Sequence, residues 1–148
     1  MKSTLNTSLE PLGPTVIDKV WNKLWSCKLH ERIRIFLWRI GNEVLSTNAA
    51  LCVRIGKRNP LCPLCNMEEE TATHIFFKCQ VTRIFWFGVC CGIRPDSIPI
   101  ANGLDIIKFT LDHPPPPPIC LSLDINQVKC TISASIQIAL TLDCIWAF

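Results

Sequence analysis

Hydrophobic residues recur at helical spacing in two long stretches near the start of the chain. The first stretch begins near Thr15 and predicts a helix with one buried stripe. The stripe consists of Ile17, Val20, Trp21, Leu24 and Trp25. The second stretch, from about His30 to Leu45, predicts a helix whose outward face carries Arg32, Arg39 and Glu43. Its inward face consists of Ile33, Phe36, Leu37, Ile40 and Val44.

Shorter helical patterns follow and place the chain in the mainly α class. Ser46-Thr47 caps a predicted helix through Ala50 to Arg54, and Gly56 ends it. A helix is also expected after Cys79, because apolar positions recur there until Gly92 and Pro95. These positions are Val81, Ile84, Phe85 and Val89, with Trp86 and Phe87 widening the face. Residues 103–111 predict a short amphipathic helix.

The last part of the chain is apolar and follows a run of prolines. Pro114 to Pro118 impose an extended polyproline spacer. Residues 132–148 approach the length of ~20 that a membrane span requires, but polar residues such as Gln137 and Asp143 favour a buried helix instead. We expect its packing partner in a missing downstream domain, which predicts an exposed apolar surface on this chain alone.

Ten cysteines in 148 residues change this picture. Residues 1–14 lack the basic and apolar regions of a signal peptide, so we expect an intracellular protein of the nucleus or cytoplasm, not a secreted one. In that reducing setting cysteine clusters are more often metal ligands than disulfides.

Cys62 and Cys65, with His74 and Cys79 close behind, have the spacing of a structural Zn²⁺ site. Asn66 tolerates the left-handed turn that brings backbone amides toward the sulfurs. The acids at 68–70 are expected at the start of a helix. Five residues from His74 to Cys79 are about 140° off one α-helical face, so that helix must end or fray near Lys78.

Two other uses of these cysteines stay open. A Cys-x-x-Cys pair also serves as a redox dithiol or disulfide, or as two inert core residues. The added histidine and third cysteine favour the metal. With zinc included, the predicted organisation is a leader (1–15), a zinc-binding domain (16–95), a linker with a short helix and the polyproline spacer (96–118), and an apolar helical tail, truncated at its end (119–148).

Charge is uneven along the chain. Residues 19–94 carry twelve Lys and Arg against five Glu, whereas residues 95–148 carry two Lys against five Asp. A basic surface favours phosphate backbones, although a merely solvated face explains the same charge. The candidate nucleic-acid contacts are Arg32, Arg34, Arg39, Arg54, Lys57, Arg58 and Arg83. Trp38 and Trp86 are candidates for stacking on bases, with a core position the favoured reading of each.

An ordered series of motifs over about residues 18–90 resembles the zinc-binding domain of plant non-LTR retrotransposon reverse transcriptases. The series is Trp21...Leu24-Trp25, Arg34-Ile35-Phe36-Leu37-Trp38-Arg39, Leu45-Ser46-Thr47, Leu51...Arg54, Cys62-Pro63-Leu64-Cys65, Glu70, His74 to Cys79, and Trp86. The resemblance implies zinc ligands at Cys62, Cys65, His74 and Cys79. It also implies a role with RNA or DNA, beside the polymerase and RNase H-like domains of a parent polyprotein.

Catalysis is not expected from this chain. It has no tyrosine and therefore no Tyr-x-Asp-Asp polymerase motif. An RNase H reaction needs clustered carboxylates around Mg²⁺, whereas the aspartates of the tail are isolated in sequence. They are Asp105, Asp112, Asp124 and Asp143. The favoured function is a non-catalytic zinc module that assists RNA or DNA binding. The alternatives are a protein-docking or purely structural module and a decayed fragment without activity.

Overall fold

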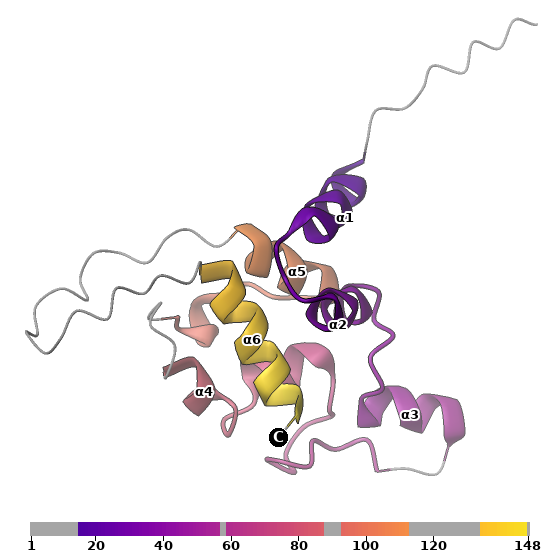
Figure 1. Cartoon of the computed structure of the whole chain (residues 1–148). Helices are drawn as coiled ribbons and strands as arrows, with labels where there is room; N and C mark the ends of the chain where they lie inside the picture. The colour runs from indigo at the N-terminus through magenta and orange to yellow at the C-terminus, as the bar shows by residue number, and fades with distance from the viewer. Residues whose placement is uncertain (1–14, 57–58, 88–92, 113–133, 148) are drawn as a thin grey trace, which may run out of the picture.

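The computed structural model describes residues 15–56, 59–87, 93–112 and 134–147. Within these ranges the regular elements are helices, and one isolated β-bridge pairs Leu61 with Glu69 (Figure 1). The mainly α class is therefore confirmed. The elements are α1 (Val16–Ser26), α2 (Glu31–Gly41), α3 (Asn48–Ile55), the π-helical turn η1 (His74–Lys78), α4 (Arg83–Phe87), the 3-10 turn η2 (Pro95–Ser97), α5 (Gly103–Asp112) and α6 (Ala134–Ala147).

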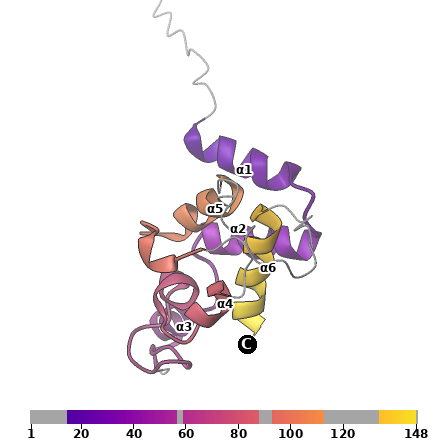
Figure 2. The ribbon, with the colours of Figure 1, turned by 90° about the vertical axis from the view of Figure 1, so that its left-hand side faces the viewer.

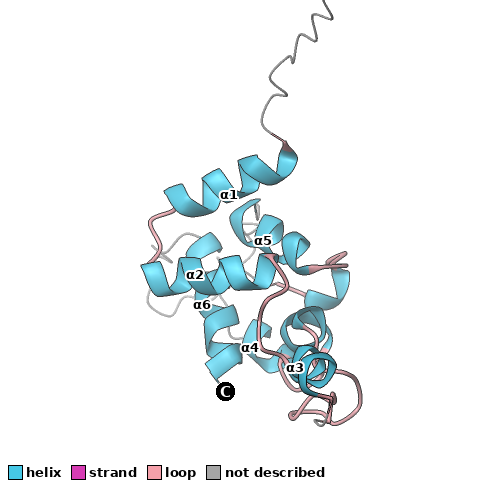
Figure 3. Ribbon diagram, turned by 90° about the vertical axis from the view of Figure 1, so that its right-hand side faces the viewer, coloured by secondary structure: helices cyan, strands magenta, loops and turns pink. Residues whose placement is uncertain are grey.

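Helix α1 begins where the sequence predicts. The Thr15 hydroxyl accepts a hydrogen bond from the Asp18 N–H, and the Asp18 carboxylate accepts one from the Thr15 N–H, which is a capping box. Val20 and Leu24 are buried as expected, but the inward placement of Ile17 and Trp25 is wrong, since both are exposed. The helix lies at one edge of the bundle, over α2 and α5, so a narrow strip of its surface is covered (Figure 3).

Helix α2 buries the predicted face but ends four residues early. Gly41 is its last residue, and a Cβ there would lie 2.5 Å from Cη2 of Trp21 and 2.9 Å from Cγ1 of Ile107, so the packing of α2 against these side chains requires glycine. Glu43 then takes a positive φ of 56°, which turns the chain away. Val44, expected inside, is exposed as a result.

Helix α3 is capped at its start by Thr47, as predicted. It is followed by Gly56, whose backbone takes the left-handed conformation that ends the helix. The expected helix start at residues 68–70 is wrong, because the next helical turn begins only after Thr71. The Glu70 carboxylate instead accepts a hydrogen bond from the backbone N–H of Asn48, at the first turn of α3. An acid near a helix N-terminus is favourable, so Glu70 stabilises a helix that lies before it in sequence.

An aromatic cluster around η1 forms the middle of the core. The Phe76 ring meets Phe36 of α2 edge to face, with centroids 6.0 Å apart. Phe77 stacks on Trp86 of α4 at 5.1 Å and meets the edge of Phe109 of α5 at 5.7 Å. The Trp86 indole is fully buried and its Nε1–H donates to the Phe76 carbonyl over 2.6 Å. This single turn therefore joins three helices.

Helix α4 is less covered than expected within the described residues. Trp86 faces the core, but Ile84, predicted to point inward, is 71% exposed, and Phe87 is 76% exposed. Val89, expected to continue this face, lies outside the described residues.

Helices α5 and α6 belong to the same core as α2. Ile106 and Ile107 of α5 and Ile138 and Leu142 of α6 are fully buried there. Figure 2 shows α6 crossing α2, with α4 beside it. The expectation that α6 lacks a packing partner within this chain is therefore wrong, and the buried core continues across residue 95.

The polar residues of α6 find partners inside the chain. Asp143 pairs with Arg32 of α2, and the Thr141 hydroxyl donates to the Gln137 carbonyl. Among the described helices, none combines the length and apolarity needed to span a bilayer. Residues 1–14 of the leader, the polyproline spacer and residues 119–133 lie outside the described part of the chain.

Candidate metal centre

Four soft or borderline ligand atoms meet at one point between the loop after α3 and η1. The sulfurs of Cys62, Cys65 and Cys79 and a ring nitrogen of His74 all lie within 4.8 Å of one another. The Cys62 and Cys79 sulfurs are 3.9 Å apart, and the Cys65 sulfur lies 3.3 Å from Nε2 of His74. A tetrahedron with Zn–S bonds of about 2.3 Å has edges of about 3.8 Å, so this donor set fits Zn²⁺.

The first two ligands sit on a tight loop held at its base. The Cys62 N–H donates to the Glu68 carbonyl and the Glu70 N–H donates to the Pro60 carbonyl, both over 2.8 Å. At its tip Asn66 has a positive φ of 54°, as predicted from its side chain. The loop therefore brings both sulfurs to the same side.

The other two ligands come from η1, where the helix widens. The Cys79 N–H donates to the His74 carbonyl over 2.7 Å, which is the i to i+5 bond of a π-turn. In a π-turn residues five apart lie near one face, unlike in an α-helix. The prediction that the helix must end near Lys78 is confirmed. The wider π-turn is what brings His74 and Cys79 to the same site.

His74 is oriented by a carboxylate on its other side. Its Nδ1 lies 3.0 Å from Oε2 of Glu68, while Nε2 faces the sulfurs. The His74 side chain is 5% exposed, so its ring cannot turn freely toward water. A proton on Nδ1, donated to Glu68, leaves the Nε2 lone pair for a metal.

The two loop thiols differ in acidity. Burial raises the pKa of Cys62 to about 11. A hydrogen bond from the Met67 backbone N–H, with smaller help from the Glu68 N–H, lowers the pKa of Cys65 to about 6. Cys65 is therefore prepared as a thiolate near neutral pH, whereas Cys62 must lose its proton when a metal binds.

Replacing Glu68 with alanine is expected to weaken zinc binding by about 10- to 100-fold, as loss of a ligand's carboxylate partner commonly does. The measurement is competition for zinc with a chromophoric chelator. Glu69→Ala is the matched control, because Glu69 is an exposed neighbour outside the contact with His74. Equal affinities for the two variants would contradict an orienting role for Glu68.

Comparison with known sequences decides the family. The family described as zinc-binding in reverse transcriptase matches residues 4–86, more than half of the chain. The chain belongs to this family. The resemblance inferred from the motifs is thereby confirmed, and this reverse transcriptase zinc-binding domain carries a Cys/His cluster compatible with zinc.

A curated relative points in the same direction. The chain is 28% identical over 69 residues to a putative ribonuclease H protein of Arabidopsis thaliana. The match covers 47% of this chain and 11% of that protein. This zinc-binding domain therefore corresponds to a small part of the relative. No solved structure matches the chain.

The candidate nucleic-acid residues of the zinc-binding domain fall on several elements. Arg32 pairs with Asp143 and Arg83 with Asp96. Arg34 donates to the Trp25 carbonyl. Arg39 and Arg54 are exposed, and Lys57 and Arg58 lie outside the described residues. Three of the candidates thus already have partners within the chain.

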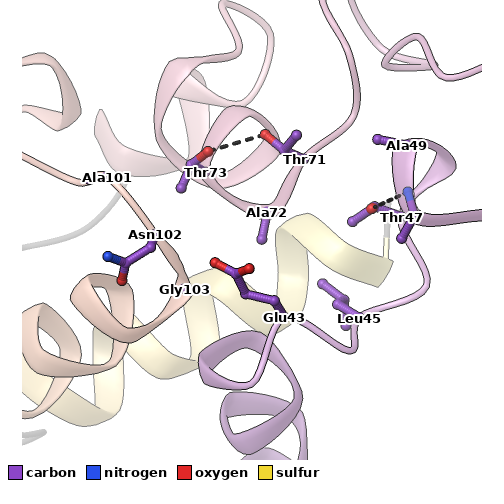
Figure 4. A pocket seen from close by; sticks show the side chains of 11 residues that line it. Glu43, Leu45, Thr47, Ala49, Thr71, Ala72, Thr73, Ala101, Asn102 and Gly103 are labelled. Atoms are coloured by element: carbon purple, nitrogen blue, oxygen red, sulfur yellow. Dashed lines mark hydrogen bonds between the residues drawn. The ribbon is translucent and has the colours of Figure 1, made fainter. Parts of the chain in front are cut away.

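A cavity of about 290 Å³ lies between three segments of the chain (Figure 4). They are the segment that follows α2, the residues just before η1 and the start of α5. Figure 4 shows Glu43 among the small side chains that line it, such as Thr47, Ala72 and Thr73. Glu43 is the one ionisable residue of the lining. The lining thus offers no pair of groups for acid–base chemistry.

Sequence reasoning missed two residues of this zinc-binding domain. Glu68 orients a candidate ligand and Glu70 caps α3, but both were read as helix-start acids. Within the chain no spacing rule links Glu68 to His74, because the contact exists only once the loop is folded. For Glu70 the sequence did contain one indication of a role, namely its place in the series of motifs shared with the family.

Proposed function

We propose that this chain is a non-catalytic structural zinc module of a retrotransposon reverse transcriptase polyprotein, of the non-LTR kind found in plants, that assists RNA or DNA binding. The convergence of Cys62, Cys65, His74 and Cys79 carries this proposal. Three sulfurs and one imidazole close a tetrahedron without an open position, which is the arrangement of a metal that supports folding.

The described residues offer little for catalysis. Apart from the Cys/His cluster, no group of three or more potential metal ligands gathers in the described part of the chain. Asp105, Asp112 and Asp143 each face a cation of the chain, namely Lys108, Lys23 and Arg32. These observations support a binding role for the module rather than an RNase H reaction, which needs carboxylates grouped around a metal.

A protein-docking role is the second candidate, and α3 favours it. This helix has no fully buried residue, and Val53 and Ile55 are 88% and 59% exposed. Large apolar side chains left exposed on one short helix suit a protein partner. Polymerase or RNase H-like domains of the parent polyprotein are the partners expected in this case.

One titration separates the two roles. The zinc-loaded full chain is expected to bind single-stranded oligonucleotides, with an affinity that falls steeply as salt rises. Removal of zinc by a chelator is expected to abolish the binding, because the metal holds the fold. Fluorescence anisotropy of labelled RNA and DNA measures both effects. Zinc-loaded protein that binds neither nucleic acid at low salt would favour the docking role.

A further inference from the structure

The outer face of α2 exposes a tryptophan that the core does not use. Ile33, Phe36, Leu37 and Ile40 turn inward, so the opposite side of the helix presents Ile35 and Trp38. Trp38 is 40% exposed, whereas Trp86, the other candidate for base stacking, is fully buried. Only the first of these two indoles is open to a ligand.

Two arginines flank this tryptophan on the same helix. Arg34 precedes Trp38 by four residues and Arg39 follows Ile35 by four, so each lies one turn from the exposed stripe. The Arg34 guanidinium carbon lies 6.0 Å from the ring centroid of Trp25, and Arg34 Nη1 donates to the Trp25 carbonyl over 2.9 Å. We call Trp25, Arg34, Trp38 and Arg39 the tryptophan–arginine face.

Charge distinguishes this face from others in the described part of the chain. Arg32 and Arg83 are neutralised by Asp143 and Asp96. In contrast, no ion pair among the described residues involves Arg34 or Arg39. Glu31 is the acid on the outer side of α2, at the start of the helix. The tryptophan–arginine face therefore combines partly exposed indoles with cations that have no carboxylate partner there.

We propose that the tryptophan–arginine face binds single-stranded nucleic acid, with a base stacked on Trp38 and phosphates held by Arg34 and Arg39. This inference rests on the proposed function and assigns it a surface. Aromatic platforms beside cations suit single strands, because an unpaired base offers its ring face while the backbone offers negative charge. RNA and DNA share both features, so the test includes both.

The test uses the zinc-loaded full chain and labelled oligouridylate or oligothymidylate in an anisotropy titration. Trp38→Leu is expected to raise the Kd about tenfold, since it removes stacking but keeps an apolar side chain. Arg39→Gln is expected to weaken binding and to reduce the salt slope by about one. The controls Phe87→Leu and Arg94→Gln alter an exposed aromatic on α4 and an exposed cation that precedes η2, and they should bind like wild type.

Each outcome decides the matter. If Trp38→Leu and Arg39→Gln bind more weakly while both controls bind like wild type, the tryptophan–arginine face is supported. The oligonucleotide with the lower Kd, RNA or DNA, is then its preferred ligand. Wild-type binding that both variants retain overturns the face and leaves the proposed function standing. Absence of wild-type binding to either oligonucleotide overturns the face together with the nucleic-acid part of that function. Zinc content and circular dichroism of every variant show that the fold is intact.

Discussion

Replacing Cys62 with serine is expected to release zinc from the chain and to unfold the loop around it. Cys62 is fully buried and contributes a sulfur to the cluster, and a hydroxyl is a poor ligand for zinc. Zinc binding provides about 10–16 kcal/mol in small zinc-dependent peptides. Since whole domains are stable by about 5–15 kcal/mol, losing even part of this energy is severe. Native mass spectrometry and thermal denaturation measure the two losses.

Cys52→Ser is the matched control, because Cys52 is a half-buried free cysteine of α3 outside the cluster. It should keep one zinc ion and a melting temperature close to that of wild type. Wild-type protein stripped by a chelator should melt like Cys62→Ser. If Cys62→Ser kept its zinc and its melting temperature, Cys62 would not be a ligand, and a redox or packing role would replace the metal centre.

Among single substitutions away from the candidate metal site, Gly103→Ala is expected to lower the free energy of unfolding most. A Cβ at Gly103 would lie 2.0 Å from the carbonyl oxygen of Ile40, and this backbone atom at the end of α2 cannot move aside as a side chain can. Helix α5 must then shift, which disturbs its fully buried residues Ile106 and Ile107. We expect a loss of about 3 kcal/mol, the upper end for overpacked cores, in urea unfolding of the zinc-loaded chain.

Gly56→Ala gives the comparison for this effect. Nothing lies within 4 Å of a Cβ at Gly56, but its φ of +72° is left-handed. Alanine should therefore cost about 1–2 kcal/mol there, from backbone strain alone. A smaller loss for Gly103→Ala than for Gly56→Ala would show that α5 does not rest on α2 as described.

The candidate metal site could be located from the sequence because its information is local. Cys62 and Cys65 share one short loop, and Asn66 has the side chain that its left-handed turn needs. The distance of five residues from His74 to Cys79 also pointed to a break in the helix. Spacing rules do not give the form of that break, a π-turn, nor the contacts that its residues Phe76 and Phe77 make with rings of other helices.

The fold was predictable in its helices but not in how they share the core. Ile17 and Trp25 fit a helical stripe, yet they are exposed because α1 lies at the edge of the bundle. The apolarity of α6 was read as a sign of a missing partner, whereas α2 and α5 cover it. Periodicity shows which face of a helix is apolar, but it does not show which other helix covers that face.

The π-turn places metal ligands and core side chains in successive positions. His74 and Cys79 bound it, and Ile75, Phe76 and Phe77 between them are all buried. Loss of the metal would free both ends of this turn and loosen the three side chains together. We therefore expect zinc occupancy and the rigidity of the aromatic cluster to rise together, because a metal that binds only the folded state stabilises that state.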